Sequence, residues 1–188
     1  MSTMSTKDTL PTNRASKHIN KTTLQAPKFT HPAPHLTFEY SIHKPTPRIL
    51  RELKYTFPEL PKRVVDELCV VPVMQECVEE MVGIGEAVDE ERDVKLENFV
   101  TWGRSCVERF RALGFWADLT DPASGYPLYT ENSAAPYPDV QGTTALLKYE
   151  VQATGCCHVL LHPKWGARVY PTTLFVSAPL DIIKAVLG

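Results

Sequence analysis

Apolar positions along the chain fall into separated clusters, and the first regular cluster begins at residue 36. Apolar and polar residues alternate in residues 36–42 (L-T-F-E-Y-S-I), a pattern typical of a strand with one buried face. A second apolar run, residues 68–74, contains Pro72, which has no backbone N–H to donate. We therefore expect this second strand to lie at a sheet edge, to bulge, or to stop pairing at Pro72.

Residues 96–113 predict the clearest helix of the chain. Its apolar residues recur mostly three and four positions apart, which places them on one stripe. The stripe consists of Leu96, Phe99, Val100, Cys106, Val107, Phe110 and Leu113. Gly114 follows where a C-terminal cap belongs, and the acidic run in residues 79–97 favours the positive N-terminal end of the helix.

The C-terminal half predicts short strands. A strand and turn are expected at residues 115–125, a polar loop from 126 to about 144, and several strands within 146–178. Residues 156–162 and 167–176 are expected to pair as a hairpin around the turn at 163–166, and residues 180–187 to form a helix. Strands interrupted by one long helix predict an α+β domain with a largely antiparallel sheet and flanking helices.

The composition of residues 1–35 differs from the rest of the chain. This segment is basic and rich in Thr, Ser, Pro and Lys, so we expect a disordered tail at 1–35 and a single α+β domain at 36–188. The tail has the charge of a mitochondrial leader but no clear amphipathic apolar face, which favours an ordinary solvated tail. We expect a cytoplasmic protein, with the mitochondrion as a second location.

Charge bears on the kind of partner, and cysteine content bears on the redox state of the thiols. The 20 basic and 22 acidic residues give a net charge of -2, so neither nucleic acid nor an anionic membrane is expected as the main partner. The five cysteines are odd in number and mostly lie beside apolar residues, which suits reduced thiols better than a disulfide framework.

The segment G-C-C-H-V-L-L-H at residues 155–162 concentrates metal-binding side chains. If it is a strand, one face carries Cys156, His158, Leu160 and His162. The other face, with Cys157, Val159 and Leu161, is apolar and expected to be core. Cys156 is then the candidate functional thiol and Cys157 a packed one. The opposing interpretation, that both cysteines are simply buried, is common for free cysteines.

A zinc site built from Cys156, His158 and His162 is the rival metal interpretation. Its spacing does not match the usual paired zinc ligands, and no fourth ligand is evident. The sequence shows no phosphate-binding glycine loop, nucleophile elbow or metalloprotease helix, so the sequence predicts no catalytic residues and no enzymatic activity.

Two ordered motifs resemble a known family. The stretch G-F-W-A-D-L-T-D-P-A-S-G at residues 114–125 and the stretch G-C-C-H-V-L-L-H-P-K-W-G at 155–166 are similar to the cobalamin trafficking proteins of the cblD class. This resemblance implies a nitroreductase-like scaffold that has lost flavin binding and catalysis. Trp116, Asp118, Asp121 and Trp165 also lie in these motifs, where we expect them to pack or to form turns.

The resemblance also implies a function and a partner. The family works with the cblC-class cobalamin processing protein, and Cys156 is expected to become an axial thiolate ligand to the cobalt of cob(II)alamin. Cobalamin is the implied cofactor, bound in the complex and directed toward methionine synthase and methylmalonyl-CoA mutase. The alternatives are a flavin-dependent oxidoreductase, which would purify yellow, and a zinc-binding scaffold, which would lose stability with a chelator.

Overall fold

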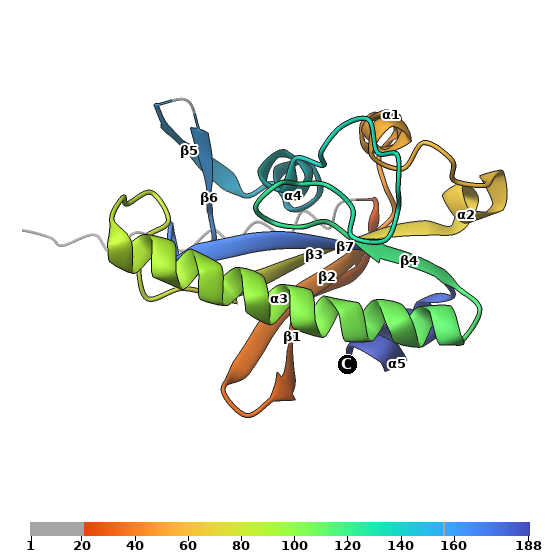
Figure 1. Ribbon diagram of the computed structural model, residues 1–188, viewed down its shortest axis with the longest axis horizontal. Coiled ribbons are helices and arrows are strands. Elements are labelled where there is room, and N and C mark those ends of the chain that lie inside the picture. Colours follow the sequence, from red (N-terminus) through yellow and green to blue (C-terminus); the bar gives the residue numbers. More distant parts are fainter. Residues whose placement is uncertain (1–20, 156) are drawn as a thin grey trace, which may run out of the picture.

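The computed structural model describes residues 21–155 and 157–188, with the side chain of Cys157 also outside the described part. A five-stranded antiparallel sheet in the order β1-β2-β3-β7-β4 organises the molecule (Figure 1). Its strands are β1 (Thr23–Ala33), β2 (Leu36–His43), β3 (Leu68–Glu76), β7 (Val169–Ser177) and β4 (Trp116–Leu119). A separate two-stranded sheet contains β5 (Glu150–Thr154) and β6 (Cys157–Leu161). The expected α+β class with a largely antiparallel sheet is thus confirmed.

Helices cover both faces of the large sheet. The helices are α1 (Pro47–Thr56), α2 (Lys62–Glu67), α3 (Glu86–Ala112), α4 (Asp139–Leu147) and α5 (Leu180–Leu187). Helices α3 and α5 pack on one face with Phe38, Val71 and Leu174, whereas α1 and α4 pack on the other with Val70 and Phe175. Because both faces are covered, the core consists of two apolar layers on either side of the sheet.

Helix α3 confirms the expected apolar stripe and extends it toward the N-terminus. Phe99, Cys106 and Phe110 are buried, but Leu113 is 57 % exposed. Leu113 differs from the prediction because it is the C-cap residue, past the last helical turn. The helix ends in a Schellman motif, in which the N–H of Gly114 binds the carbonyl of Arg111 and the N–H of Phe115 binds that of Phe110. Gly114 has φ +82°, so glycine is the residue that this cap requires.

The expected edge position of the strand around Pro72 is wrong. Strand β3 lies in the middle of the sheet, and its pairing with β7 continues through Pro72↔Thr173. The pairs between β2 and β3 lie on either side of Pro72, at Tyr40↔Val73 and His43↔Val70. A central strand therefore accommodates the proline, with the β2–β3 pairs placed around the position that lacks an N–H.

The expected boundary at residue 35/36 is also wrong for the described residues. Residues 23–33 form β1, which pairs with β2 from Thr23↔His43 to Ala33↔Leu36. The prolines and polar residues that suggested a tail are typical of an edge strand, where one side of the backbone needs no partner. Residues 1–20 lie outside the described part. No helix of the described residues is long and apolar enough to span a membrane.

Two further expectations need correction. Residues 139–147 form α4 rather than a loop, and β6 pairs with β5, not with β7. The turn at 163–166 is present, but only as a bridge between His162 and Gly166. The turn signal at residues 163–166 therefore marked where the chain leaves one sheet for the other. The helix expected at residues 180–187 is confirmed as α5.

Candidate functional site

The β5–β6 hairpin carries the cysteine pair. Its two strands pair from Glu150↔Leu161 to Thr154↔Cys157, and the hairpin extends away from the large sheet (Figure 1). The strands are joined by residues 155 and 156, and Gly155 has φ +61°, a left-handed conformation that favours glycine. Cys156, the predicted cobalt ligand, lies outside the described residues.

Three other cysteines have described side chains, and all three are buried. These are Cys69, Cys77 and Cys106. Burial raises the pKa of the Cys69 thiol and raises the pKa of Cys77 and of Cys106 to about 12. Because metal ligation and nucleophilic attack require the thiolate, these three cysteines are poorly suited to either role.

His162 is a structural residue at the base of the hairpin. Its Nδ1 accepts the backbone N–H groups of Lys164 and Trp165 at 3.2 and 3.3 Å, so Nε2 carries the ring proton and donates to Glu39 Oε1 at 3.0 Å. Its ring stacks on the indole of Trp165 with 3.9 Å between centroids. Both ring nitrogens are thus occupied, and the predicted zinc set of Cys156, His158 and His162 loses a ligand.

The burial pattern of β6 differs from the expected one. Leu160 and His162 are buried, Val159 and Leu161 are half-buried, and His158 is exposed. Leu160 packs against Met74 and Val169 because that side of β6 lies on the large sheet. The face expected to carry the functional thiol is therefore partly core. The choice of Cys156 over Cys157 consequently rests on the family motif rather than on strand geometry.

The W-A-D and D-P-A-S-G motifs are packing and turn elements, as expected. Asp118 is buried and accepts the N–H groups of Leu119 and Tyr129 and the hydroxyl of Thr130. Asp121 accepts the hydroxyl of Ser124 within a tight turn. Trp116 and Trp165 contact neighbouring rings, Trp116 edge-to-face with Phe57 and Trp165 stacked on His162.

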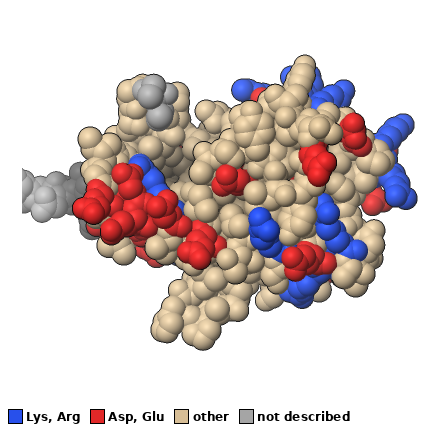
Figure 2. Space-filling model, in the orientation of Figure 1, with Lys and Arg blue, Asp and Glu red and all other residues tan. Residues whose placement is uncertain are grey.

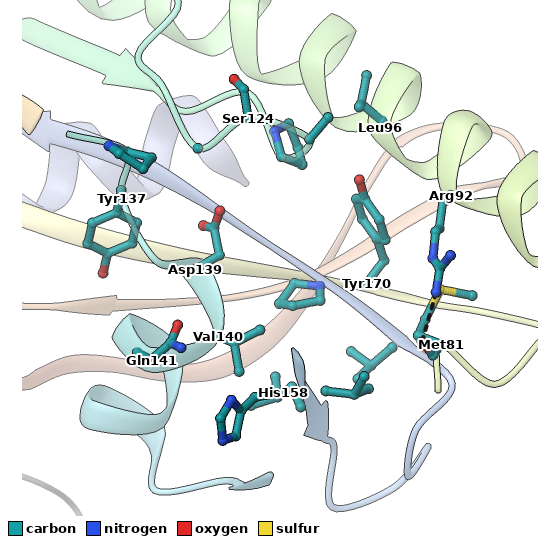
Figure 3. Close-up of a pocket in the computed structure, with 18 of the residues that line it drawn as sticks. Met81, Arg92, Leu96, Ser124, Tyr137, Asp139, Val140, Gln141, His158 and Tyr170 are labelled. Carbon is teal, nitrogen blue, oxygen red and sulfur yellow. Dashed lines mark hydrogen bonds between the residues drawn. The ribbon is translucent and has the colours of Figure 1, made fainter. Parts of the chain in front are cut away.

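A pocket of about 660 Å³ adjoins the hairpin. Figure 3 shows the Asp139 carboxyl and the Tyr170 hydroxyl directed into the space between α3 and α4, with His158 on the side of β6. Thr173 Oγ1 donates a short hydrogen bond to Asp139 Oδ1. Burial raises the pKa of Asp139 to about 7; the Thr173 hydrogen bond lowers it and the Asp121 charge raises it.

Sequence reasoning missed this pocket. Asp139 and Tyr170 come from segments that were expected to be a loop and a hairpin strand, and they approach one another only because α4 packs across β7. The Y-P-D sequence at the start of α4, residues 137–139, was the available signal, since an acid in the first turn of a helix often marks its start.

The fold and the site together define a class: an α+β protein with a two-stranded hairpin, β5–β6, whose strand β6 lines a pocket beside the large sheet. The chain belongs to the methylmalonic aciduria and homocystinuria type D protein family, whose model matches residues 3–186. Cobalamin trafficking protein CblD of Mus musculus is 32% identical over 139 residues, which cover 72% of this chain and 45% of that protein. The Homo sapiens protein of the same name is 32% identical over 148 residues, covering 76% of this chain and 48% of the relative. The chain thus spans about half the length of these curated relatives.

Proposed function

We propose that this chain is a cobalamin trafficking protein without catalytic activity, working in the cytoplasm and in the mitochondrion. In this proposal it forms a complex with the cblC-class processing protein, and the Cys156 thiolate binds the cobalt of cob(II)alamin as an axial ligand. The bound cofactor then passes toward methionine synthase and methylmalonyl-CoA mutase. The names of the matched relatives support the general part of this proposal, a role in cobalamin trafficking.

The observation that carries the proposal is the hairpin connection. Residues 155 and 156 join two strands that extend from the body of the protein, and β5 is exposed along most of its length. A ligand offered from such a connection can reach a metal held in a second protein with little rearrangement of the large sheet. Thiolate is a soft donor, which suits cobalt better than a carboxylate would.

The three cysteines with described side chains are poor candidates for the cobalt ligand, which leaves Cys156 and Cys157. Cys69, Cys77 and Cys106 are buried with raised pKa values, so each would need a local opening of the core to expose a thiolate. Cobalt ligation would use the Cys156 thiolate, with the thiol proton released to solvent.

The test is spectroscopic. Cob(II)alamin bound to the cblC-class protein is mixed with wild type, Cys156→Ser or Cys157→Ser, and visible absorption and electron paramagnetic resonance spectra are recorded. We expect wild type and Cys157→Ser to shift the spectra toward sulfur ligation and Cys156→Ser to leave them unchanged. Cys157→Ser is the matched control, because it makes the same substitution at the adjacent position.

Each other outcome contradicts a defined part of the proposal. A shift retained by Cys156→Ser and lost by Cys157→Ser would assign the ligand to the second cysteine. No shift with wild type would remove sulfur ligation altogether. A wild-type protein that purifies with stoichiometric flavin would contradict the absence of catalysis.

A further inference from the structure

The pocket beside the hairpin has the size and the walls of a small-molecule site. Its volume of about 660 Å³ falls within the range of ligand pockets, roughly 300–1,000 Å³. Most of the wall is apolar, and its contributors include Met81, Leu96, Val140, Leu160, Val169 and Pro171. These residues come from α3, α4, β6, β7 and the loop after β3, so the pocket is formed by the tertiary fold rather than by one loop.

One polar group in the pocket is only partly satisfied. Asp139 Oδ1 is held by Thr173, while among the described residues no donor binds Oδ2. Figure 3 shows the Asp139 carboxyl directed into the space between α3 and α4. A half-buried carboxyl with one oxygen held and the other directed into an apolar pocket is arranged to accept a hydrogen bond from a ligand.

The charges around Asp139 select the kind of ligand. Asp93 of α3 lines the pocket, and the Asp121 carboxylate is close enough to raise the pKa of Asp139. The Tyr170 hydroxyl of β7 also faces the pocket, and burial raises its pKa, so it remains protonated. The basic groups of the lining are His158 of β6 and Arg92 of α3.

The Arg92 guanidinium is already committed to partners within the protein. It binds Asp89 at 2.7 Å and the carbonyls of Met81 and Gly83. Figure 2 shows acidic residues gathered over the N-terminal half of α3, and the exposed members of this patch are Glu86, Asp89, Glu90, Asp93 and Glu97. The pocket therefore disfavours anions and favours a ligand with N–H donors on an apolar body.

We propose that this pocket binds a peripheral primary amide of the corrin ring, with the amide N–H donating to Asp139 Oδ2. This inference rests on the proposed function, since it takes cobalamin as the ligand. The corrin periphery combines apolar methyl groups with primary amides, which matches apolar walls around a single acceptor. The pocket lining also includes His158, which follows Cys156 by two positions in the sequence.

The test compares cobalamin with derivatives in which one peripheral amide has been replaced by a carboxylate. Affinity of the full chain for the complex of cblC-class protein with each cob(II)alamin is measured by calorimetry at pH 8. For one of these derivatives, we expect the wild-type chain to bind the complex about tenfold to a hundredfold more weakly than it binds the complex with unmodified cobalamin. This is the usual effect of losing a hydrogen bond to a charged group. In Asp139→Asn, whose side chain is neutral, this discrimination should fall below about threefold.

Matched controls separate the pocket from the fold. Asp66→Asn makes the same change at an exposed position of α2 and should discriminate as wild type does. His158→Gln replaces the imidazole in the pocket lining, and this variant should keep the discrimination too. Urea unfolding of Asp139→Asn confirms that the variant is folded before its affinities are compared.

The outcomes distinguish this inference from the proposed function. Wild-type sulfur ligation with the same discrimination in Asp139→Asn overturns the pocket site and leaves the Cys156 proposal standing. Discrimination between amide and carboxylate that depends on Asp139, without a spectral sign of sulfur ligation, supports the pocket site and overturns the Cys156 proposal. If wild type binds none of the cobalamin complexes, both proposals fail.

Discussion

At the scale of single residues, the contrast between His158 and His162 shows what a local pattern cannot resolve. Both histidines follow the cysteine pair at even spacing, and the sequence gives no sign that one of them is committed to Glu39, far away in the chain on β2. That partnership depends on how the hairpin base lies on the large sheet. The sequence could predict the cluster of ligand-type residues, but not which of its imidazoles is free.

His162→Ala is expected to destabilise the protein by about 3 kcal/mol, because it leaves the Glu39 carboxylate buried without its partner. It also removes the ring that stacks on Trp165 and the acceptor of two backbone N–H groups. Urea unfolding at pH 7 measures the change.

Glu39→Gln is the control for this prediction. Its amide oxygen can still accept from His162 Nε2, so the single substitution should cost less than His162→Ala. The double variant with Glu39→Gln and His162→Ala should be more stable than His162→Ala alone, because burying an unpaired amide costs less free energy than burying an unpaired carboxylate. A cost below about 1 kcal/mol for His162→Ala would show that the pair contributes no more than a surface ion pair.

At the scale of elements, the sequence predicted those segments whose pattern is local. Helix α3 has one apolar stripe and a glycine cap, and α5 is short and strongly apolar on one side, so both were predictable. Strand β1 and helix α4 were not, because their polar residues and prolines resemble loops when read alone. The pairing of β6 was mispredicted for the same reason: the turn at residues 163–166, which follows β6, suggested β7 as its partner, whereas β5 is the partner.

Helix α4 is held to the sheet by a close contact that a glycine allows. A Cβ built on Gly142 would overlap the hydroxyl and ring of Tyr137. Tyr137 is buried and packs edge-to-face on Phe175 of β7, with 4.9 Å between ring centroids. Glycine is therefore needed here for space, and not for an unusual backbone angle.

Gly142→Ala should consequently destabilise the protein by roughly 1–3 kcal/mol, although alanine is the better helix former. Thermal unfolding followed by circular dichroism measures the loss. In the Tyr137→Phe background the loss should shrink, because the overlapping hydroxyl is gone. That hydroxyl has no hydrogen-bond partner among the described residues, so Tyr137→Phe alone should be close to neutral. Equal losses in both backgrounds would contradict the proposed overlap.

At the scale of the whole molecule, two titratable groups, the buried His43 and the half-buried Asp139, give the stability opposite dependences on pH. Burial lowers the pKa of His43 to about 4 from 6.5, so the unfolded chain binds more protons between these values and stability falls as the solution is acidified. Burial raises the pKa of Asp139 from 3.8 to about 7, so the folded chain binds more protons there and stability falls as the pH rises from 4 to 7. In wild type the two slopes partly cancel between about pH 4 and 6.5.

Replacing one of the two groups should leave the dependence of stability on pH that the other group causes. His43→Gln removes the imidazole that contacts Thr23 and Ser41, and its stability relative to wild type should improve as the pH falls from 6.5 toward 4. Asp139→Asn should improve relative to wild type as the pH rises from 4 toward 7, where the buried carboxylate becomes charged. Urea unfolding midpoints for the three proteins, taken at half-unit steps of pH, give these differences directly. Curves parallel to that of wild type for both variants would mean that neither group changes its protonation on folding.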